Sequence, residues 1–214
     1  MKKPDSIIIS ALLSISGGLQ DAYTFNVRGR VFANAQTGNI VLMSQNLLLG
    51  NIGQAVYYCL PVLSYLSGVV SAVIIQNLFH NSSKVFWRQV VLFMEIVALT
   101  AVGFFPEPYH MVPNMLVSFS CAMQVHSFKE IRGNRFASTM CIGNITSASE
   151  SLGKYIFTRN RRDLSKFLII FGMVCFFAAG AGIGGVFSYI IKEKTIWISS
   201  VLLIVSALLM NKKR

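Results

Sequence analysis

Long apolar blocks separated by short polar stretches form the main pattern along this chain. Blocks of helical length with few charges occupy residues 7–25, 55–79, 85–105, 111–128, 167–191 and 195–210. At a rise of about 1.5 Å per residue, most of these blocks can cross a hydrocarbon core of roughly 30 Å. The pattern therefore predicts an all-α, polytopic membrane helix bundle in which residues 1–214 form a single membrane domain.

Two more segments, 31–50 and 136–157, have helical length but are dense in polar residues. The first contains Gly38-Asn39 and the second contains Gly143-Asn144. Neither segment could face lipid on all sides, because a polar group without a partner is costly in hydrocarbon. Each is predicted to be a re-entrant segment or a broken helix, and the pattern alone leaves open whether it spans.

The distribution of basic residues distinguishes six crossings from eight. If both polar segments span, the 19 Lys and Arg divide almost evenly between the two sides. If neither spans, only Arg28, Arg30, Lys192 and Lys194 lie outside, and the other basic residues share the side of both termini. Cytoplasmic loops carry an excess of Lys and Arg, so the six-span arrangement with both termini in the cytoplasm is favoured.

The chain also resembles itself at an offset of 104 to 105 residues, which divides it into repeats at about 6–105 and 109–210. The identical pairs are Gln20/Gln124, Arg28/Arg132, Gly29/Gly133, Phe32/Phe136, Ala33/Ala137, Gly38/Gly143, Asn39/Asn144, Ile40/Ile145, Ser44/Ser149 and Leu47/Leu152. Each half then holds three spans, and because three is odd the second half enters the membrane in the opposite orientation. Inverted repeats with interrupted segments at matching positions are typical of transporters.

The motifs Gly17-Gly18-Leu19-Gln20-Asp21-Ala22, Phe32-Ala33-Asn34 and Thr37-Gly38-Asn39 resemble the signature of the YoaK family. These are small bacterial membrane proteins that carry a domain of unknown function and are usually described as six-span. The resemblance implies a membrane location and six spans, without an activity. The second half departs from the pattern, because Val125 stands where the first half has Asp21.

Composition narrows the class of function. The chain is 54% hydrophobic and only 13% charged, which is half the usual charged fraction of a soluble domain. The net charge is +11, and the basic residues lie between the apolar blocks. This placement indicates anionic lipid headgroups as the partner and argues against nucleic acid. The 4 cysteines form no CxxC pair, and the sequence holds no recognisable catalytic motif or metal cluster. Neither an enzyme nor a cofactor is expected.

Two acidic residues are candidates for an ion or substrate pathway. Glu95 lies in the middle of the 85–105 block, where a carboxylate costs about 2.5 kcal/mol or more and is usually functional. The alternative is a protonated Glu95 that bonds across helices for structural reasons. Asp21 either pairs with Arg28 near the outer surface or binds a cation or proton beside the first polar segment.

Further candidates for the pathway come from the polar segments and the fourth span. They are Thr37, Gly38, Asn39, Gln124, His126, Gly143 and Asn144. A glycine beside an asparagine supplies a flexible backbone point and an amide that donates and accepts, although helix termination would explain it equally. His126 could relay protons near neutral pH or simply bond at the interface.

The leading functional hypothesis is a small-solute or ion transporter or channel of the bacterial plasma (inner) membrane, with a central polar site. The alternative is a non-transporting membrane scaffold or a lipid-interacting protein. Gly180 and Gly184 show the small-xxx-small spacing of close helix packing, within one subunit or between subunits. A homodimer is compatible with so small a bundle.

Overall fold

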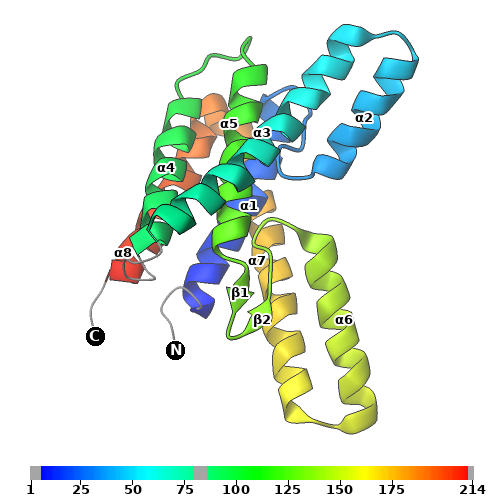
Figure 1. Cartoon of the computed structure of the whole chain (residues 1–214), viewed down its shortest axis with the longest axis vertical. Helices are drawn as coiled ribbons and strands as arrows, with labels where there is room; N and C mark the ends of the chain where they lie inside the picture. The colour runs from blue at the N-terminus through cyan, green and yellow to red at the C-terminus, as the bar shows by residue number, and fades with distance from the viewer. Residues whose placement is uncertain (1–5, 80–85, 212–214) are drawn as a thin grey trace.

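The computed structural model of the chain describes residues 6–79 and 86–211, which are almost entirely helical (Figure 1). Val85 and the basic residues Lys2, Lys3, Lys84, Lys212, Lys213 and Arg214, on which parts of the span and charge predictions rest, lie outside the described residues. In chain order the elements are α1 (Ile7–Val27), α2 (Gln36–Leu48), α3 (Ile52–Leu78), α4 (Phe86–Val102), α5 (Met111–Ser127), β1 (Glu130–Ile131), β2 (Asn134–Arg135), α6 (Cys141–Thr158), α7 (Arg161–Ile191), the 3-10 helix η2 (Lys192–Thr195) and α8 (Ile196–Asn211). The prediction of a helical bundle is therefore confirmed.

The ends of the helices follow from local chemistry. α2 ends in a Schellman motif in which Gly50 has φ +75°, the Asn51 N–H bonds the Asn46 carbonyl and the Gly50 N–H bonds the Leu47 carbonyl. α7 begins at Asn160, whose side-chain oxygen accepts the Arg162 N–H at 3.0 Å. These two devices close the α2–α3 and α6–α7 turns.

The helices pack in a pattern that links the two parts of the chain. α1 packs mainly on α7 and also on α8, while α5 packs mainly on α3 and also on α4. α2 packs on α3, α6 packs on α7, and α4 packs on α8. The α2–α3 pair and the α6–α7 pair project from the body toward opposite ends of the molecule (Figure 1). We call them the α2–α3 arm and the α6–α7 arm.

The main hydrophobic core lies where α1, α4, α5 and α8 meet. Its fully buried side chains include Leu13 of α1, Leu92 and Leu99 of α4, Val117 of α5 and Leu203 of α8. A second cluster joins α3 to α4 and α5, and a third joins α1 and α7 to the β1–β2 hairpin. The body is therefore held by apolar contacts from helices that are far apart in sequence.

Four glycines let helix backbones approach closely. A Cβ added at Gly18 would overlap the Phe177 carbonyl of α7, and one added at Gly180 would overlap the Ile15 carbonyl of α1. At the α3–α5 crossing, a Cβ on Gly68 would overlap the Phe119 carbonyl. Gly184 also lies against Leu19 of α1. Gly180 and Gly184 thus face α1 of the same chain.

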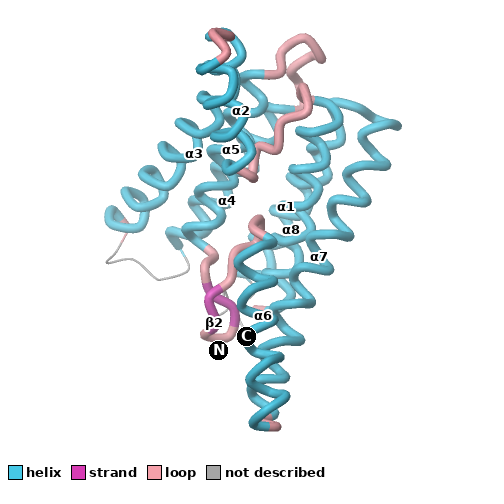
Figure 2. Tube along the Cα trace, turned by 90° about the vertical axis from the view of Figure 1, so that its right-hand side faces the viewer, coloured by secondary structure: helices cyan, strands magenta, loops and turns pink. Residues whose placement is uncertain are grey.

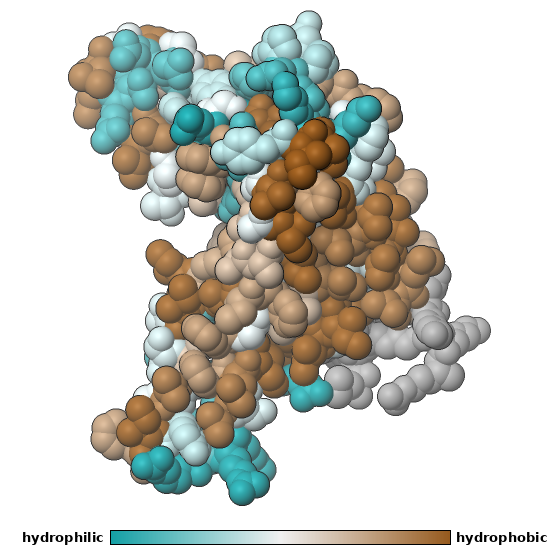
Figure 3. Space-filling view, turned by 180° about the vertical axis from the view of Figure 1, so that it is seen from behind, coloured by the Kyte–Doolittle hydropathy of each residue, from teal (hydrophilic) through white to brown (hydrophobic). Residues whose placement is uncertain are grey.

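Two helical stretches among the described residues are long and apolar enough to cross a membrane. They are α3 and the stretch Arg161–Met210, which comprises α7, η2 and α8. The other predicted spans are shorter or more polar: α4 and α5 have 17 residues each. Large apolar side chains are exposed along α3 and α7, and Figure 3 shows a broad hydrophobic band with hydrophilic surface at the two ends of the molecule.

Candidate functional site

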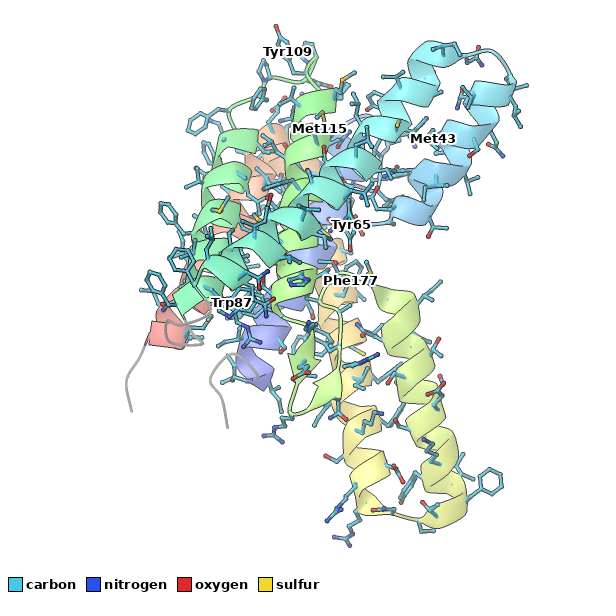
Figure 4. The ribbon with its side chains drawn as sticks, in the orientation of Figure 1. Met43, Tyr65, Trp87, Tyr109, Met115 and Phe177 are labelled. Atoms are coloured by element: carbon cyan, nitrogen blue, oxygen red, sulfur yellow. The ribbon has the colours of Figure 1, made fainter. Side chains whose placement is uncertain are left out.

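Two segments without regular secondary structure enter the middle of the molecule from opposite ends. We call residues 31–35, which precede α2, the first entering segment, and residues 136–140, which precede α6, the second entering segment. Figure 2 shows such loops, in pink, reaching inward from both ends between the helices. Tyr65 of α3 and Phe177 of α7, both labelled in Figure 4, lie at this middle level.

The first entering segment runs back along α1. The Ala33 N–H donates to the Thr24 hydroxyl, and the Asn34 N–H donates to Asp21 Oδ1 at 3.1 Å. The Asn34 side-chain amide donates to the Gly17 carbonyl at 3.1 Å. Gly17 lies near the midpoint of α1, so the segment penetrates about halfway along that helix.

The second entering segment makes the corresponding contacts with α5. The Gln124 amide donates to the Ser138 hydroxyl at 2.6 Å, and the Cys121 thiol bonds the Thr139 hydroxyl at 3.2 Å. Thr139 also lies against Gly17, where an added Cβ would come within 2.8 Å of its methyl group. The second segment therefore contacts both α5 and α1.

Contacts across the centre complete the site. The Ser118 hydroxyl of α5 donates to the Ala33 carbonyl at 2.6 Å and accepts from the Gln36 amide. The Gln124 amide also donates to the Leu13 carbonyl of α1. α1, α5 and the two entering segments thus enclose a buried group that we call the central polar cluster. Its members are Gln20, Asp21, Asn34, Ser118, Cys121, Gln124, Ser138 and Thr139.

The two asparagines of the Gly-Asn pairs hold the entering segments in place. The Asn144 amide donates to the Ala137 carbonyl at 2.6 Å while its oxygen accepts the Ala137 N–H. Asn39 donates to the Phe32 carbonyl at 3.3 Å and to the Gln36 side chain. Both asparagines are buried, so their visible role is to fix the turn into α2 or α6.

The residues beside these asparagines have free space around their Cα atoms or are exposed to solvent. A Cβ added at Gly38 or Gly143 would meet no atom within 4 Å, and Thr37 is exposed on α2. Gly143 and Asn144 line a pocket of about 820 Å³ between α6 and the β1–β2 hairpin. Ala137 lies in the same pocket wall, directly before Ser138 of the central polar cluster.

Arg28 does not pair with Asp21. It is fully buried and donates to the carbonyls of Val102, Phe105, Pro106 and Tyr109 and to the Tyr23 hydroxyl. Those carbonyls belong to the last residue of α4 and to the loop that follows it, where a cation complements the helix dipole. The suggested ion pair with Asp21 is replaced by this cap on α4, which leaves Asp21 with the Asn34 N–H as its hydrogen-bond donor.

The remaining candidates lie apart from the cluster to different degrees. Glu95 is buried on α4, and it and Asp21 both lie close enough to the Cys121 thiol to interact electrostatically with it. His126 is only partly buried and bonds Gln76 of α3 at 3.0 Å. The structure therefore groups Asp21 and Gln124, places Glu95 nearby, and separates His126.

Several buried oxygens in this region have no hydrogen-bond donor among the described residues. Besides both Glu95 oxygens, they are Ser14 Oγ, Gln20 Oε1, Asn34 Oδ1, Ser120 Oγ and Gln124 Oε1. Oxygen atoms of this kind are the ligands that hard cations prefer, and they also accept bonds from polar solutes. The centre of the molecule therefore holds several oxygens of the chemical kind that coordinates cations or accepts hydrogen bonds from polar groups.

A pair of serines in each half was missed by the sequence reasoning. Ser14 and Ser16 precede Gln20 by the same distances as Ser118 and Ser120 precede Gln124, and all four are buried at the centre. The signal that could have found them is the self-alignment, extended a few residues toward the N-terminus. Serine is common enough that the residues alone did not stand out.

The fold and site define a helical protein with apolar helices able to cross a membrane and a polar centre formed by two entering segments. The chain belongs to the protein family of unknown function DUF1275, whose model matches residues 9–209. Comparison with curated proteins gave no match. Comparison with solved structures gave none either.

Proposed function

We propose that the chain is a six-span integral membrane protein made of two inverted three-span repeats related by a pseudo-two-fold axis in the membrane plane. Three observations support this. The packing of α1 on α7 corresponds to that of α5 on α3, and α2 on α3 corresponds to α6 on α7. The two arms point to opposite ends of the molecule (Figure 1). Asn39 and Asn144 make the same contact seven residues back in the chain.

The proposed location is the bacterial plasma membrane, with both termini cytoplasmic. The broad apolar surface of α3 and α7 supports it, since a soluble monomer rarely exposes so large an apolar area (Figure 3). The spans would be α1, α3, α4, α5, α7 and α8, while α2 and α6 would be re-entrant. The narrower assignment to a YoaK-like family within DUF1275 rests on the motifs around Asp21 and Asn39.

Within this architecture the chain acts as a small-solute or ion transporter or channel whose pathway passes through the central polar cluster. The observation that carries the proposal is the environment of Asp21, which is 8% exposed and has no cationic partner among the described residues. A carboxylate buried in this way must hold a proton or bind a cation to remain in the protein interior. A pathway for cations or protons would need such a group at its centre.

The pocket beside Gly143 and Asn144 provides an entrance. It opens between α6 and the β1–β2 hairpin and reaches Ala137, the neighbour of Ser138 in the central polar cluster. Lys129 and Arg135 lie at its rim together with Glu130 and Glu150, so both signs of charge are available to a solute. Under the proposed topology this entrance faces the cytoplasm.

A liposome assay tests the role of Asp21. Purified protein would be reconstituted with a pH-sensitive dye inside, and proton movement would be followed after separate Na⁺, K⁺ and proton gradients are imposed. We expect protein-dependent flux that falls at least tenfold in Asp21→Asn. Asp163→Asn is the matched control because it removes a partly exposed carboxylate that lies outside the central polar cluster. Flux in Asp21→Asn equal to that of the native protein would refute Asp21 as the site.

Glu95 requires a separate test because its two oxygens have no donor among the described residues. If Glu95 carries a proton during transport, Glu95→Gln should insert and fold normally but lose pH-dependent flux. If it is only structural, Glu95→Gln should be silent and Glu95→Leu should lower stability. A silent Glu95→Gln together with unchanged flux in Asp21→Asn would favour the alternative of a scaffold or lipid-interacting protein.

A further inference from the structure

A second cavity lies along the α6–α7 arm, and its lining includes no member of the central polar cluster. It is a groove of about 640 Å³ between α7, Tyr155 of α6 and the β1–β2 hairpin. Its floor includes Ile169 and Met173, which belong to the apolar cluster that joins α1 and α7 to the hairpin. The groove is therefore built on ordered core packing.

The polarity of the groove changes along its length. Arg132, in the turn of the hairpin, and Arg161, the first residue of α7, supply two guanidinium groups that form no hydrogen bond or ion pair with the described residues. Asp163 in the same turn of α7 does not line the groove and instead accepts from the Thr158 hydroxyl. The lining of the groove thus includes two arginines and no carboxylate.

The rest of the groove is an apolar track along α7. Leu164, Leu168, Gly172 and Phe176 follow one another at intervals of one helical turn, so they form a continuous stripe on one side of the helix. Leu168 is 58% exposed and Phe176 is 41% exposed, so the stripe is accessible from outside. At Gly172 an added Cβ would meet nothing within 4 Å, which leaves a hollow in the middle of the track.

The length of this track matches one leaflet of a membrane. From Leu164 to Phe176 the helix rises about 18 Å at roughly 1.5 Å per residue. Half of a hydrocarbon core is about 15 Å. Basic pockets between membrane helices are known to hold anionic headgroups, and two guanidinium groups suit a phosphate.

We propose that this groove binds a single anionic phospholipid, with its phosphate at Arg132 and Arg161 and one acyl chain along the Leu164–Phe176 stripe. The inference rests on the membrane location proposed above and is independent of transport. The charge selects an anionic headgroup, and the apolar stripe selects a ligand that carries a chain. A soluble phosphate would satisfy only the first of these requirements.

Native mass spectrometry of the detergent-solubilised full chain tests the proposal. The probes are phosphatidylglycerol, phosphatidylcholine of the same chain length, and inorganic phosphate as competitor. We expect one phosphatidylglycerol to bind at least about tenfold more tightly than phosphatidylcholine, since each cationic side chain near a headgroup contributes about 1 kcal/mol. Excess inorganic phosphate should not displace it. Equal binding of the two lipids, or displacement by phosphate alone, would overturn the proposal.

Two pairs of variants separate the groove from general surface charge. Arg132→Gln with Arg161→Gln should weaken phosphatidylglycerol binding about tenfold or more. Lys154→Gln with Arg162→Gln removes the same charge from exposed residues that line neither this groove nor the pocket beside Asn144, and it should change little.

The second pair tests the apolar track alone. Gly172→Leu should fill it and reduce binding without a change in charge. Gly182→Leu is its control, because Gly182 also lies on α7 with nothing within 4 Å of an added Cβ and is outside the groove. Unchanged binding in both groove variants would refute the site, whatever the result of the flux assay on Asp21→Asn.

Discussion

Replacing Arg28 should destabilise the protein more than replacing any exposed arginine. Its guanidinium donates to Tyr23 Oη at 2.7 Å and to the carbonyls that follow α4, the closest being Phe105 at 2.7 Å. Tyr109, labelled at the upper end of Figure 4, belongs to the same loop. Arg28 itself is 0% exposed, and its bonds to Tyr23 and to the Val102 carbonyl are buried, so water does not readily replace those two bonds.

The magnitude follows from these contacts. A hydrogen bond to a charged group contributes about 1.5–3 kcal/mol, and neighbouring bonds do not add in full. The cost of burying the guanidinium offsets part of the total. Arg28→Gln keeps at most two donors, so it cannot bond both the buried Val102 carbonyl and the three partly buried carbonyls of Phe105, Pro106 and Tyr109. We therefore expect the free energy of unfolding to fall by about 3–5 kcal/mol.

The assay is equilibrium unfolding of the purified protein in mixed micelles, followed by circular dichroism. Arg30→Gln is the matched control, because Arg30 is exposed and its guanidinium only lies over the Phe25 ring at 5.6 Å. That variant should change the free energy of unfolding by no more than about 1 kcal/mol. An Arg28→Gln variant as stable as Arg30→Gln would show that the α4 cap is not a stabilising contact and would refute the reasoning.

Three further predictions concern packing, the entering segments and topology. Gly180→Ala should destabilise by about 1–3 kcal/mol in the same unfolding assay because its methyl overlaps the α1 backbone, whereas Gly182→Ala should be neutral or slightly stabilising. Asn144→Ala should lower the free energy of unfolding by about 1–3 kcal/mol, because it removes both hydrogen bonds to Ala137 of the second entering segment, and it should increase proteolysis within that segment. Unchanged stability would contradict the role of Asn144 in holding the segment. In a cysteine-free background, Asn51→Cys and Thr158→Cys should react with an impermeant maleimide from opposite sides of the membrane, and labelling from one side would exclude inverted repeats.

The helices were predictable because a long apolar block with few charges satisfies its own backbone hydrogen bonds only as a helix. The polar segments were recognised as unusual, but their internal division was not. The 31–50 segment contains an irregular stretch with a turn and then α2, which begins at Gln36. Ala35 precedes that helix without a side-chain cap, so no local signal marks the boundary. Contacts with α1 and α5 set it instead, and these come from tertiary structure.

The candidate site was predictable only in part, because the sequence reveals repeated residues but not their tertiary contacts. The self-alignment pointed to Gln124 and to both Gly-Asn pairs, yet it could not tell a holding residue from a solute-facing one. Arg28 and Arg132 illustrate the limit: the same Arg-Gly pair is repeated, but Arg28 is buried among carbonyls and Arg132 is exposed in a hairpin turn. The difference arises because the carbonyls that accept from Arg28 lie more than 70 residues away, at the last residue of α4 and in the loop after it.

The packing of α1 on α7 has a consequence for biosynthesis. α1 leaves the ribosome first, and its closest partner is not complete until Ile191 has been made. At about 5–20 residues per second, this delay is on the order of ten seconds. During that time Gly18 of α1 lacks the α7 backbone on which it packs. Under the proposed membrane topology, α1 would therefore remain beside the translocation machinery or a temporary neighbour. The N-terminal half made alone should therefore be recognised by quality-control proteases, and supplying the C-terminal half as a second polypeptide should rescue it.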